Sequence, residues 1–193
     1  MNPIGVLLQE TAEAKFSEAP LIPKFFDALK ESSDTVDTPV AEIETTENPT
    51  IYLITRNESL AGDIHPITGV PFERQTIELG TGEIIEGVFP IFGSTYDANI
   101  SEDLFTESDY KQFKECNKQL LEAMETDPEL KSKFSTEQLE QIKDGIYDGS
   151  APDGYIWHHA PQPGLIQLAD ANIHAGTGHT GGRTVWGGGN ENR

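Results

Sequence analysis

The chain has 193 residues, which is enough for one ordinary domain with an appended segment, and its 36% hydrophobic content suffices for a single core. Its formal net charge of −20 argues against a protein that binds nucleic acid through a broad basic face, because such binding depends on Lys and Arg neutralising phosphates. The single cysteine, Cys116, excludes an internal disulfide and a cysteine-based zinc cluster.

No run in the sequence approaches the roughly 18–20 apolar residues of a membrane span, and residues 1–10 lack the basic and apolar regions of a secretion signal. We therefore expect no membrane span, and export, if it occurs, would use a specialised route. Whether Met1 is the native start stays open.

The first quarter of the chain differs in composition from the rest. Residues 31–50 are rich in Ser, Thr, Asp, Glu and Pro without an apolar period, which predicts a flexible arm. Apolar residues within 21–29 recur at helical spacing and predict one short amphipathic helix. The sequence thus predicts an N-terminal helix and acidic linker over residues 1–50 and one folded domain over residues 51–193.

Short β-type runs begin the predicted domain, at residues 51–55, 75–79 and 84–92. Turn residues separate them at 68–69 and 80–82. This pattern predicts a small antiparallel sheet or hairpin.

Two helices are predicted next. Thr106 and Asp109 resemble a capping box at the start of the first helix, and Pro128 either ends that helix or opens a short turn after it. Ser135 and Gln138 resemble a capping box at the start of the second. The apolar faces that support these helices comprise Tyr110, Phe113, Leu120, Leu121 and Met124 in the first and Leu139, Ile142 and Ile146 in the second.

The last part of the chain predicts a strand at residues 155–159, a turn at 161–164, a strand at 165–168 and a short helix at 170–174. This β–turn–β–α order is that of a ββα-metal motif. The predicted fold class is therefore α+β, a small antiparallel sheet and helices with the ββα-metal motif at about residues 154–182.

Four of the five histidines lie within residues 158–179 of this motif. Neutral imidazole is a good ligand for zinc and related metals, and a histidine is also suited to proton abstraction near neutral pH. Neighbouring residues of a regular strand face opposite ways, so His158 and His159 cannot both ligate one ion unless a bulge or the strand end turns one of them. One of them would hold the metal, while the other would face a water molecule and remove a proton from it.

The other two histidines, His174 and His179, are five residues apart, which on an ideal helix places them ~140° apart. We therefore expect the helix to end between them, and Gly176 and Gly178 provide the break.

The string DGYIWHHAPQPGLIQLADANIHAGTGHTGG, at residues 153–182, resembles the WHH group of HNH/endonuclease VII (ββα-metal) nucleases. These are C-terminal toxin domains of bacterial polymorphic toxins and antibacterial effectors. Residues 65–73 and 86–92 also resemble segments that precede such sites, so the resemblance covers roughly residues 63–189. The chain departs from many relatives in having Ala160 and Pro161 after the histidine pair.

The resemblance implies His159 as the general base and one divalent ion, Mg²⁺, Zn²⁺ or Ni²⁺. The metal ligands that it implies are His158, His174 and His179. Gln167 and Asp170 are candidates for the residue that orients the base. Arg183 is either a bidentate phosphate clamp or a partner in an ordinary salt bridge.

We therefore expect a metal-dependent endonuclease that hydrolyses phosphodiester bonds, with DNA favoured over RNA as the substrate. As a toxin it would leave the producing bacterium by a specialised route, act in the cytoplasm of a target cell, and have a cognate immunity protein. Two alternatives stay open: an RNase of the same fold, and a non-catalytic interaction module that holds a structural zinc.

Overall fold

The structure is a computed structural model and describes residues 49–189. The chain divides between Glu44 and Thr45, and all the described residues belong to the second unit. The helix and the acidic linker predicted for residues 1–50 lie outside the described part up to residue 48, and Thr50 already belongs to the first strand.

The first sheet has the strand order β1-β3-β2, with β1 at Thr50–Tyr52, β2 at Phe72–Glu78 and β3 at Ile84–Pro90. Strands β2 and β3 pair antiparallel, which confirms the predicted hairpin. Strand β1 is shorter than predicted and runs parallel to β3.

The second sheet has the order β4-β6-β5, with β4 at Ser94–Asn99, β5 at Tyr155–His159 and β6 at Leu165–Asp170. All its pairs are antiparallel. The sequence analysis predicted β5 and β6 but missed β4. Strand β4 has the sequence STYDAN and a shift in register between Ser94 and Asp97, so it lacks a clear alternation of apolar residues.

Short 3₁₀ helices, η1 at Glu58–Leu60 and η2 at Glu102–Leu104, lie in the connections. The α-helices are α1 at Asp109–Thr126, α2 at Pro128–Ser132, α3 at Thr136–Asp148, α4 at Ala171–Gly176 and α5 at Gly182–Val185. No helix within residues 49–189 is long and apolar enough to cross a membrane.

The two predicted capping boxes had different outcomes. At α3 the prediction is confirmed, since Ser135 and Gln138 bond each other's backbone N–H groups. At α1 it is wrong, because Ser108 is the N-cap residue and its side chain makes no capping bond. The segment before α1 is instead held by the side chain of Gln112, which donates to two carbonyls of that segment.

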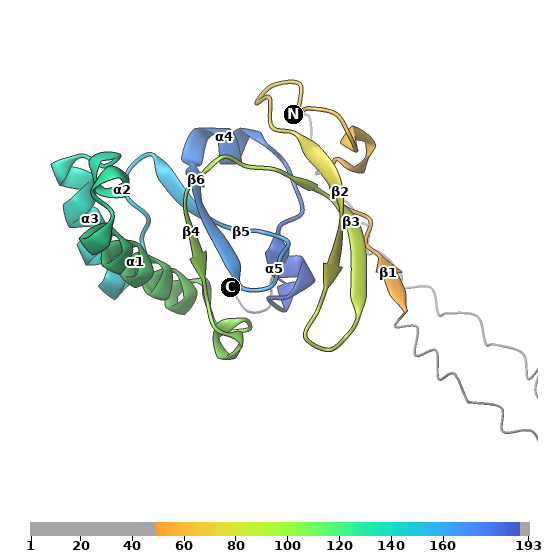
Figure 1. Ribbon diagram of the computed structural model, residues 1–193. Helices are drawn as coiled ribbons and strands as arrows, with labels where there is room; N and C mark the ends of the chain where they lie inside the picture. Colours follow the sequence, from red (N-terminus) through yellow and green to blue (C-terminus); the bar gives the residue numbers. More distant parts are fainter. Residues whose placement is uncertain (1–48, 190–193) are drawn as a thin grey trace, which may run out of the picture. The chain divides into compact units, whose positions relative to one another are not determined.

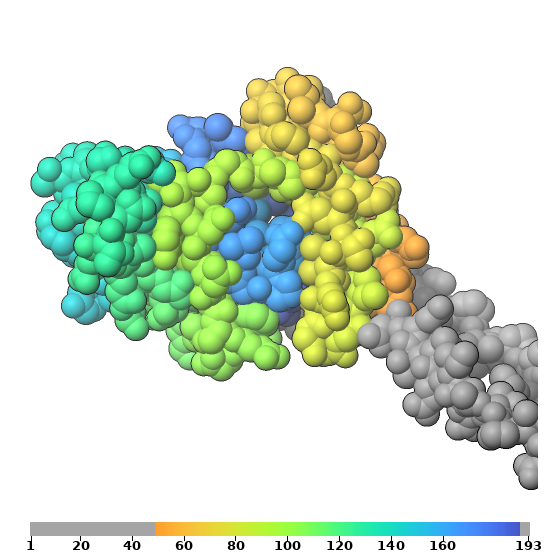
Figure 2. Space-filling model, in the orientation of Figure 1, coloured from red at the N-terminus to blue at the C-terminus, as the bar shows by residue number. Residues whose placement is uncertain are grey.

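Helices α1 and α3 cover one face of the β4-β6-β5 sheet, and the β1-β3-β2 sheet lies on its other side (Figure 1). On the helix side, Trp157 and Leu168 belong to the larger core together with Leu120 of α1. On the opposite side, Ala169 belongs to a smaller core with Phe72. Figure 2 shows the blue surface of the β5–β6 region between the yellow β2–β3 hairpin and the green surface around β4. Strand β5 is therefore placed between two packed layers.

The glycine-rich end of the chain packs closely on the turn that follows β5. A Cβ atom added to Gly182 would lie 1.7 Å from the carbonyl oxygen of Ala160. The indole Nε1 of Trp186 donates to this same oxygen at 2.9 Å. Glycine is required at position 182 because α5 approaches the backbone of the turn directly.

Candidate active site

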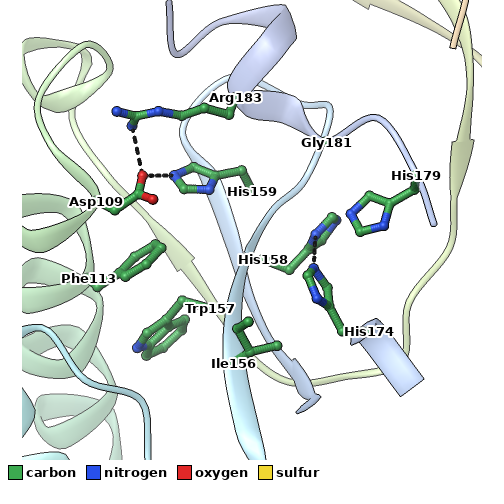
Figure 3. A pocket seen from close by; sticks show the side chains of 10 residues that line it. All are labelled: Asp109, Phe113, Ile156, Trp157, His158, His159, His174, His179, Gly181 and Arg183. Atoms are coloured by element: carbon green, nitrogen blue, oxygen red, sulfur yellow. Dashed lines mark hydrogen bonds and ion pairs between the residues drawn. The ribbon is translucent and has the colours of Figure 1, made fainter. Parts of the chain in front are cut away.

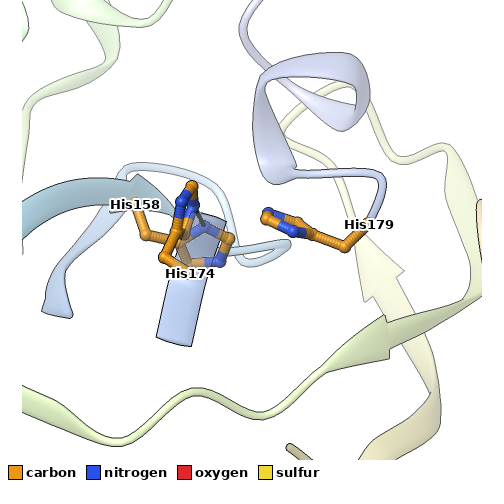
Figure 4. Close-up of side chains that lie close together, drawn as sticks. All are labelled: His158, His174 and His179. Atoms are coloured by element: carbon orange, nitrogen blue, oxygen red, sulfur yellow. Dashed lines mark hydrogen bonds between the residues drawn. The ribbon is translucent and has the colours of Figure 1, made fainter. Parts of the chain in front are cut away.

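Three histidines from three consecutive segments converge on one point (Figure 4). His158 is the penultimate residue of β5, His174 lies in α4, and His179 lies in the loop that follows α4. One nitrogen of each ring lies within 4.8 Å of the others. The helix does end between His174 and His179, as the spacing predicts.

The nitrogens of this histidine triad (His158, His174 and His179) are close enough together to hold one metal ion, and two of them have the spacing of metal ligands. His158 Nδ1 and His174 Nε2 are 3.2 Å apart. Two ligand nitrogens at ~2.0–2.1 Å from one ion in tetrahedral geometry lie roughly 3.3 Å apart. The donor set is three imidazoles, which suits zinc or nickel better than the oxygen-seeking magnesium ion.

A hydrogen bond sets the ring of His179. Its Nδ1 lies 2.7 Å from the carbonyl oxygen of Thr177, and because a carbonyl only accepts, Nδ1 carries the hydrogen. The lone pair of the neutral ring is then on Nε2. Thr177 is held in turn, since its hydroxyl bonds the carbonyl of Ile173 and the hydroxyl of Thr68. A second shell of hydrogen bonds therefore orients this candidate ligand.

All three rings of the triad are kept neutral by their surroundings. Burial lowers the pKa of His158 well below its ordinary value, and the neighbouring rings of His179 and His174 lower it further. Burial, followed by the charge that His179 would carry, lowers the pKa of His174 to about 4. Burial also lowers the pKa of His179, as does Arg56. Near neutral pH the three lone pairs are thus available to a metal.

The ring of Phe92 packs against all three imidazole rings of the triad. Its ring is buried, and its centroid lies 4.7 Å from that of His158, 5.2 Å from that of His174 and 5.1 Å from that of His179. The sequence analysis included this residue in a resembling segment but assigned it no role.

His159 points to the opposite side of β5 (Figure 3). The register of β5 against β6 is regular through His159, so no bulge is needed to separate it from His158. Its Nε2 bonds Gln112 Oε1 at 2.6 Å, and Asp109 Oδ1 lies 3.8 Å from the same nitrogen. Arg183 completes this cluster, with Nη1 2.7 Å from Gln112 Oε1 and 3.4 Å from Asp109 Oδ1.

One pocket of about 310 Å³ joins the two sides. Its lining comprises Asp109, Phe113, Ile156, Trp157, His158, His159, His174, His179, Gly181 and Arg183. The candidate base and the candidate metal ligands therefore border a single cavity.

The remaining sequence-predicted residues have other surroundings. Gln167 pairs with Asp97 across the sheet and donates to its carboxylate at 3.1 Å, and it does not border the pocket. Asp170 caps α4 by accepting from two backbone N–H groups. Arg183 borders the pocket but is only 2% exposed, and its Nη2 also donates to the carbonyl of Glu107. Its placement is that of the salt-bridge alternative.

Arg56 is an exposed cation beside the triad that the sequence analysis did not identify. A Cβ added to Gly178 would lie 2.4 Å from its guanidinium carbon, so the guanidinium packs on the backbone next to His179. The loop is held by the Arg56 N–H, which donates to Thr180 Oγ1 at 2.9 Å, and by a bond from Asn57 to the Gly178 carbonyl. Among the described residues, no carboxylate forms an ion pair with Arg56.

A family profile described as the DNase/tRNase domain of colicin-like bacteriocins matches residues 81–181. The match spans 101 of the 193 residues, which is more than half of the chain, and it contains both His159 and the whole triad. The chain belongs to this family. No curated protein and no solved structure matches it.

Membership in the colicin-DNase family confirms the predicted class, a bacterial nuclease toxin whose substrate is nucleic acid. The matched range covers β3 to α4 and the loop that holds His179. Arg56 and Arg183 lie outside it.

Proposed function

We propose that this domain is a metal-dependent DNA endonuclease that acts as an antibacterial toxin, with His159 as the general base. The observation that supports this most strongly is that two adjacent histidines face different surroundings. His158 faces two other imidazoles, whereas His159 faces away from them and still borders the same pocket.

In this proposal His158, His174 and His179 hold one divalent ion, which when bound would stabilise charge on the phosphate and on the leaving 3′-oxygen. His159 accepts a proton from the attacking water, as a neutral imidazole can near pH 7. Arg56 donates to a phosphate oxygen beside the metal, because it is exposed and lies next to His179.

Zinc and nickel are the ions that this proposal favours over magnesium. The described ligand set is three neutral nitrogens, and such sites follow the preference of imidazole for transition metals. A structural zinc site is closed by four protein ligands. The three ligands found within residues 49–189 leave a position for water or phosphate and thus favour a catalytic site over a structural one.

The bacteriocin family also supports two proposals about biology. A producing cell needs an immunity protein against such a nuclease, and the toxin acts after export into a neighbouring cell. The chain carries 13 Lys and Arg against 33 Asp and Glu, so we expect the domain to bind DNA through the metal and a small number of phosphate contacts instead of a wide basic face.

The test is an assay of purified full-length protein on supercoiled plasmid and on tRNA, each with Zn²⁺, Ni²⁺, Mg²⁺ or EDTA. We expect plasmid cleavage with the transition metals, no cleavage with EDTA, and slower loss of tRNA. Cleavage of tRNA alone would identify an RNase. Failure to cut either substrate, together with unfolding on chelation, would favour the structural zinc module.

A further inference from the structure

A buried amide connects the candidate base to the helical layer. Gln112 lies in α1 and is fully buried. Its Nε2 donates to the carbonyl oxygens of Leu104 at 2.7 Å and Phe105 at 2.8 Å. Because carbonyls only accept, these two bonds use both amide hydrogens and determine which end of the side chain is nitrogen. The oxygen is therefore on the side that faces His159.

Two donors converge on that oxygen. Arg183 Nη1 lies 2.7 Å from Gln112 Oε1, and a guanidinium has no acceptor, which supports the same orientation of the amide independently. His159 Nε2 lies 2.6 Å from Oε1. An amide oxygen only accepts, so this contact is a hydrogen bond only if His159 Nε2 carries the hydrogen.

Asp109 also lies near this ring, but its geometry is weaker. Asp109 Oδ1 is 3.8 Å from His159 Nε2, which is beyond hydrogen-bond distance. The same oxygen lies closer to Arg183, at 3.4 Å from Nη1. The Asp109 carboxylate is thus nearer to the guanidinium than to the imidazole, and the hydrogen bond of His159 Nε2 is the one to Gln112.

We propose that Gln112 is a positioning residue that holds His159 in the tautomer protonated at Nε2, so that the neutral ring offers Nδ1 as its proton acceptor. The role given to Nδ1 rests on the proposed function, whereas the tautomer itself does not. Arg183 acts with Gln112, because it fixes the shared oxygen and ties α5 to the segment before α1 through the carbonyl of Glu107.

The primary test is NMR of the full chain with ¹⁵N-labelled histidine, recorded with and without Zn²⁺ at pH 8. We expect the coupling pattern of the His159 ring to show a proton on Nε2 and none on Nδ1. A proton on Nδ1 would overturn the proposal, whether or not the protein cleaves nucleic acid.

The second test compares Gln112→Met with Asn117→Leu. Asn117 is a matched control because it is also a fully buried amide of α1 that donates to carbonyls, at Phe113, Gly145 and Ser150. Both variants remove buried hydrogen bonds and are expected to lower the melting temperature. Zn²⁺ affinity, measured at low temperature, reports that the triad is intact in each.

Only Gln112→Met should shift His159 to a mixture of tautomers and lower kcat by about 10- to 100-fold with KM unchanged. A plasmid-cleaving wild type whose Gln112→Met variant keeps the Nε2–H tautomer and the parental kcat would contradict the positioning role. A wild type that shows the tautomer but cleaves nothing would instead contradict the proposed function.

Discussion

His158 and His159 are consecutive in β5, yet the first contacts His174 at 3.2 Å and the second bonds Gln112 at 2.6 Å on the other side of the strand. The alternation of a regular strand is sufficient to produce this division. In the proposed function, the same pair of residues thus separates metal binding from proton transfer.

Variants of the two kinds of histidine should therefore separate binding from cleavage. We expect His159→Ala to lower plasmid cleavage by ~100- to 10,000-fold, the range for loss of a general base, with Zn²⁺ affinity unchanged. His174→Ala should lower both cleavage and Zn²⁺ affinity, because a ligand is lost. Calorimetric titration and a plasmid assay measure the two effects. Parental cleavage by His159→Ala would show that the base is assigned wrongly.

The lowered pKa values of the triad make the metal-free domain sensitive to acid. His174 has a pKa of about 4 in the folded state against 6.5 ordinarily, so the unfolded chain binds more protons between these values. The free energy of unfolding should then fall as pH falls from about 6.5 to about 4. After allowance for its partial exposure, His174 contributes roughly 1–2 kcal/mol to this loss.

Urea unfolding of the metal-free protein at several pH values between 7 and 4 measures this loss. His174→Gln serves as the control, since it cannot titrate and should show a shallower pH dependence. Equal slopes for the variant and the wild type would contradict the assigned shift.

Metal removal should destabilise the domain without unfolding it, because three ligands form an open site on a fold that has its own core. A Zn²⁺ concentration of about 100 times Kd should add ~2.7 kcal/mol and raise the melting temperature by roughly 5–10 °C. Calorimetric scans with Zn²⁺ and with EDTA measure the difference. His158→Ala should abolish the increase, and an increase that persisted in this variant would place the metal elsewhere.

Arg56 should contribute one phosphate contact to the electrostatic part of DNA binding. We expect Arg56→Ala in the cleavage-deficient His159→Ala background to weaken DNA binding and to reduce the slope of log K against log salt by about 1. Arg74 is the matched control, since it is also exposed but pairs with Glu86 at 3.1 Å. Fluorescence anisotropy at several salt concentrations compares Arg56→Ala with Arg74→Ala, and identical slopes would exclude the proposed phosphate contact.

Gly182 should tolerate no side chain. In Gly182→Ala the added methyl would overlap the Ala160 carbonyl at 1.7 Å, so α5 has to move and the bond from Trp186 is lost. We expect a loss of more than about 3 kcal/mol in the free energy of unfolding. Gly181→Ala is the control, because its nearest contact would be an ordinary 3.5 Å. Similar denaturation midpoints for the two variants would mean that the turn after β5 moves enough to accommodate the added methyl group at little cost in stability.

Much of the fold near the site was predictable because its signals are local. The capping box at Ser135, the order of β5, β6 and α4, and the end of the helix before His179 all follow from residues close together in the chain. The first capping box was wrong for a physical reason. The segment before α1 is held by Gln112, seven and eight residues away from the carbonyls that it binds, and not by a residue at the helix end.

The sequence by itself determined that His158 and His159 face opposite ways and that the helix ends between His174 and His179, whereas the resemblance to the WHH nucleases implied which of the adjacent pair joins the other two. Strand alternation and the break after α4 are consequences of backbone geometry at short range. Only the tertiary structure decided what surrounds them: Phe92 under the rings, Arg56 beside His179, and Gln112 against His159. A residue pattern indicates that a face of a strand or helix is buried. Which side chains contact that face depends on the packing of segments that lie 47 or more residues apart in the chain.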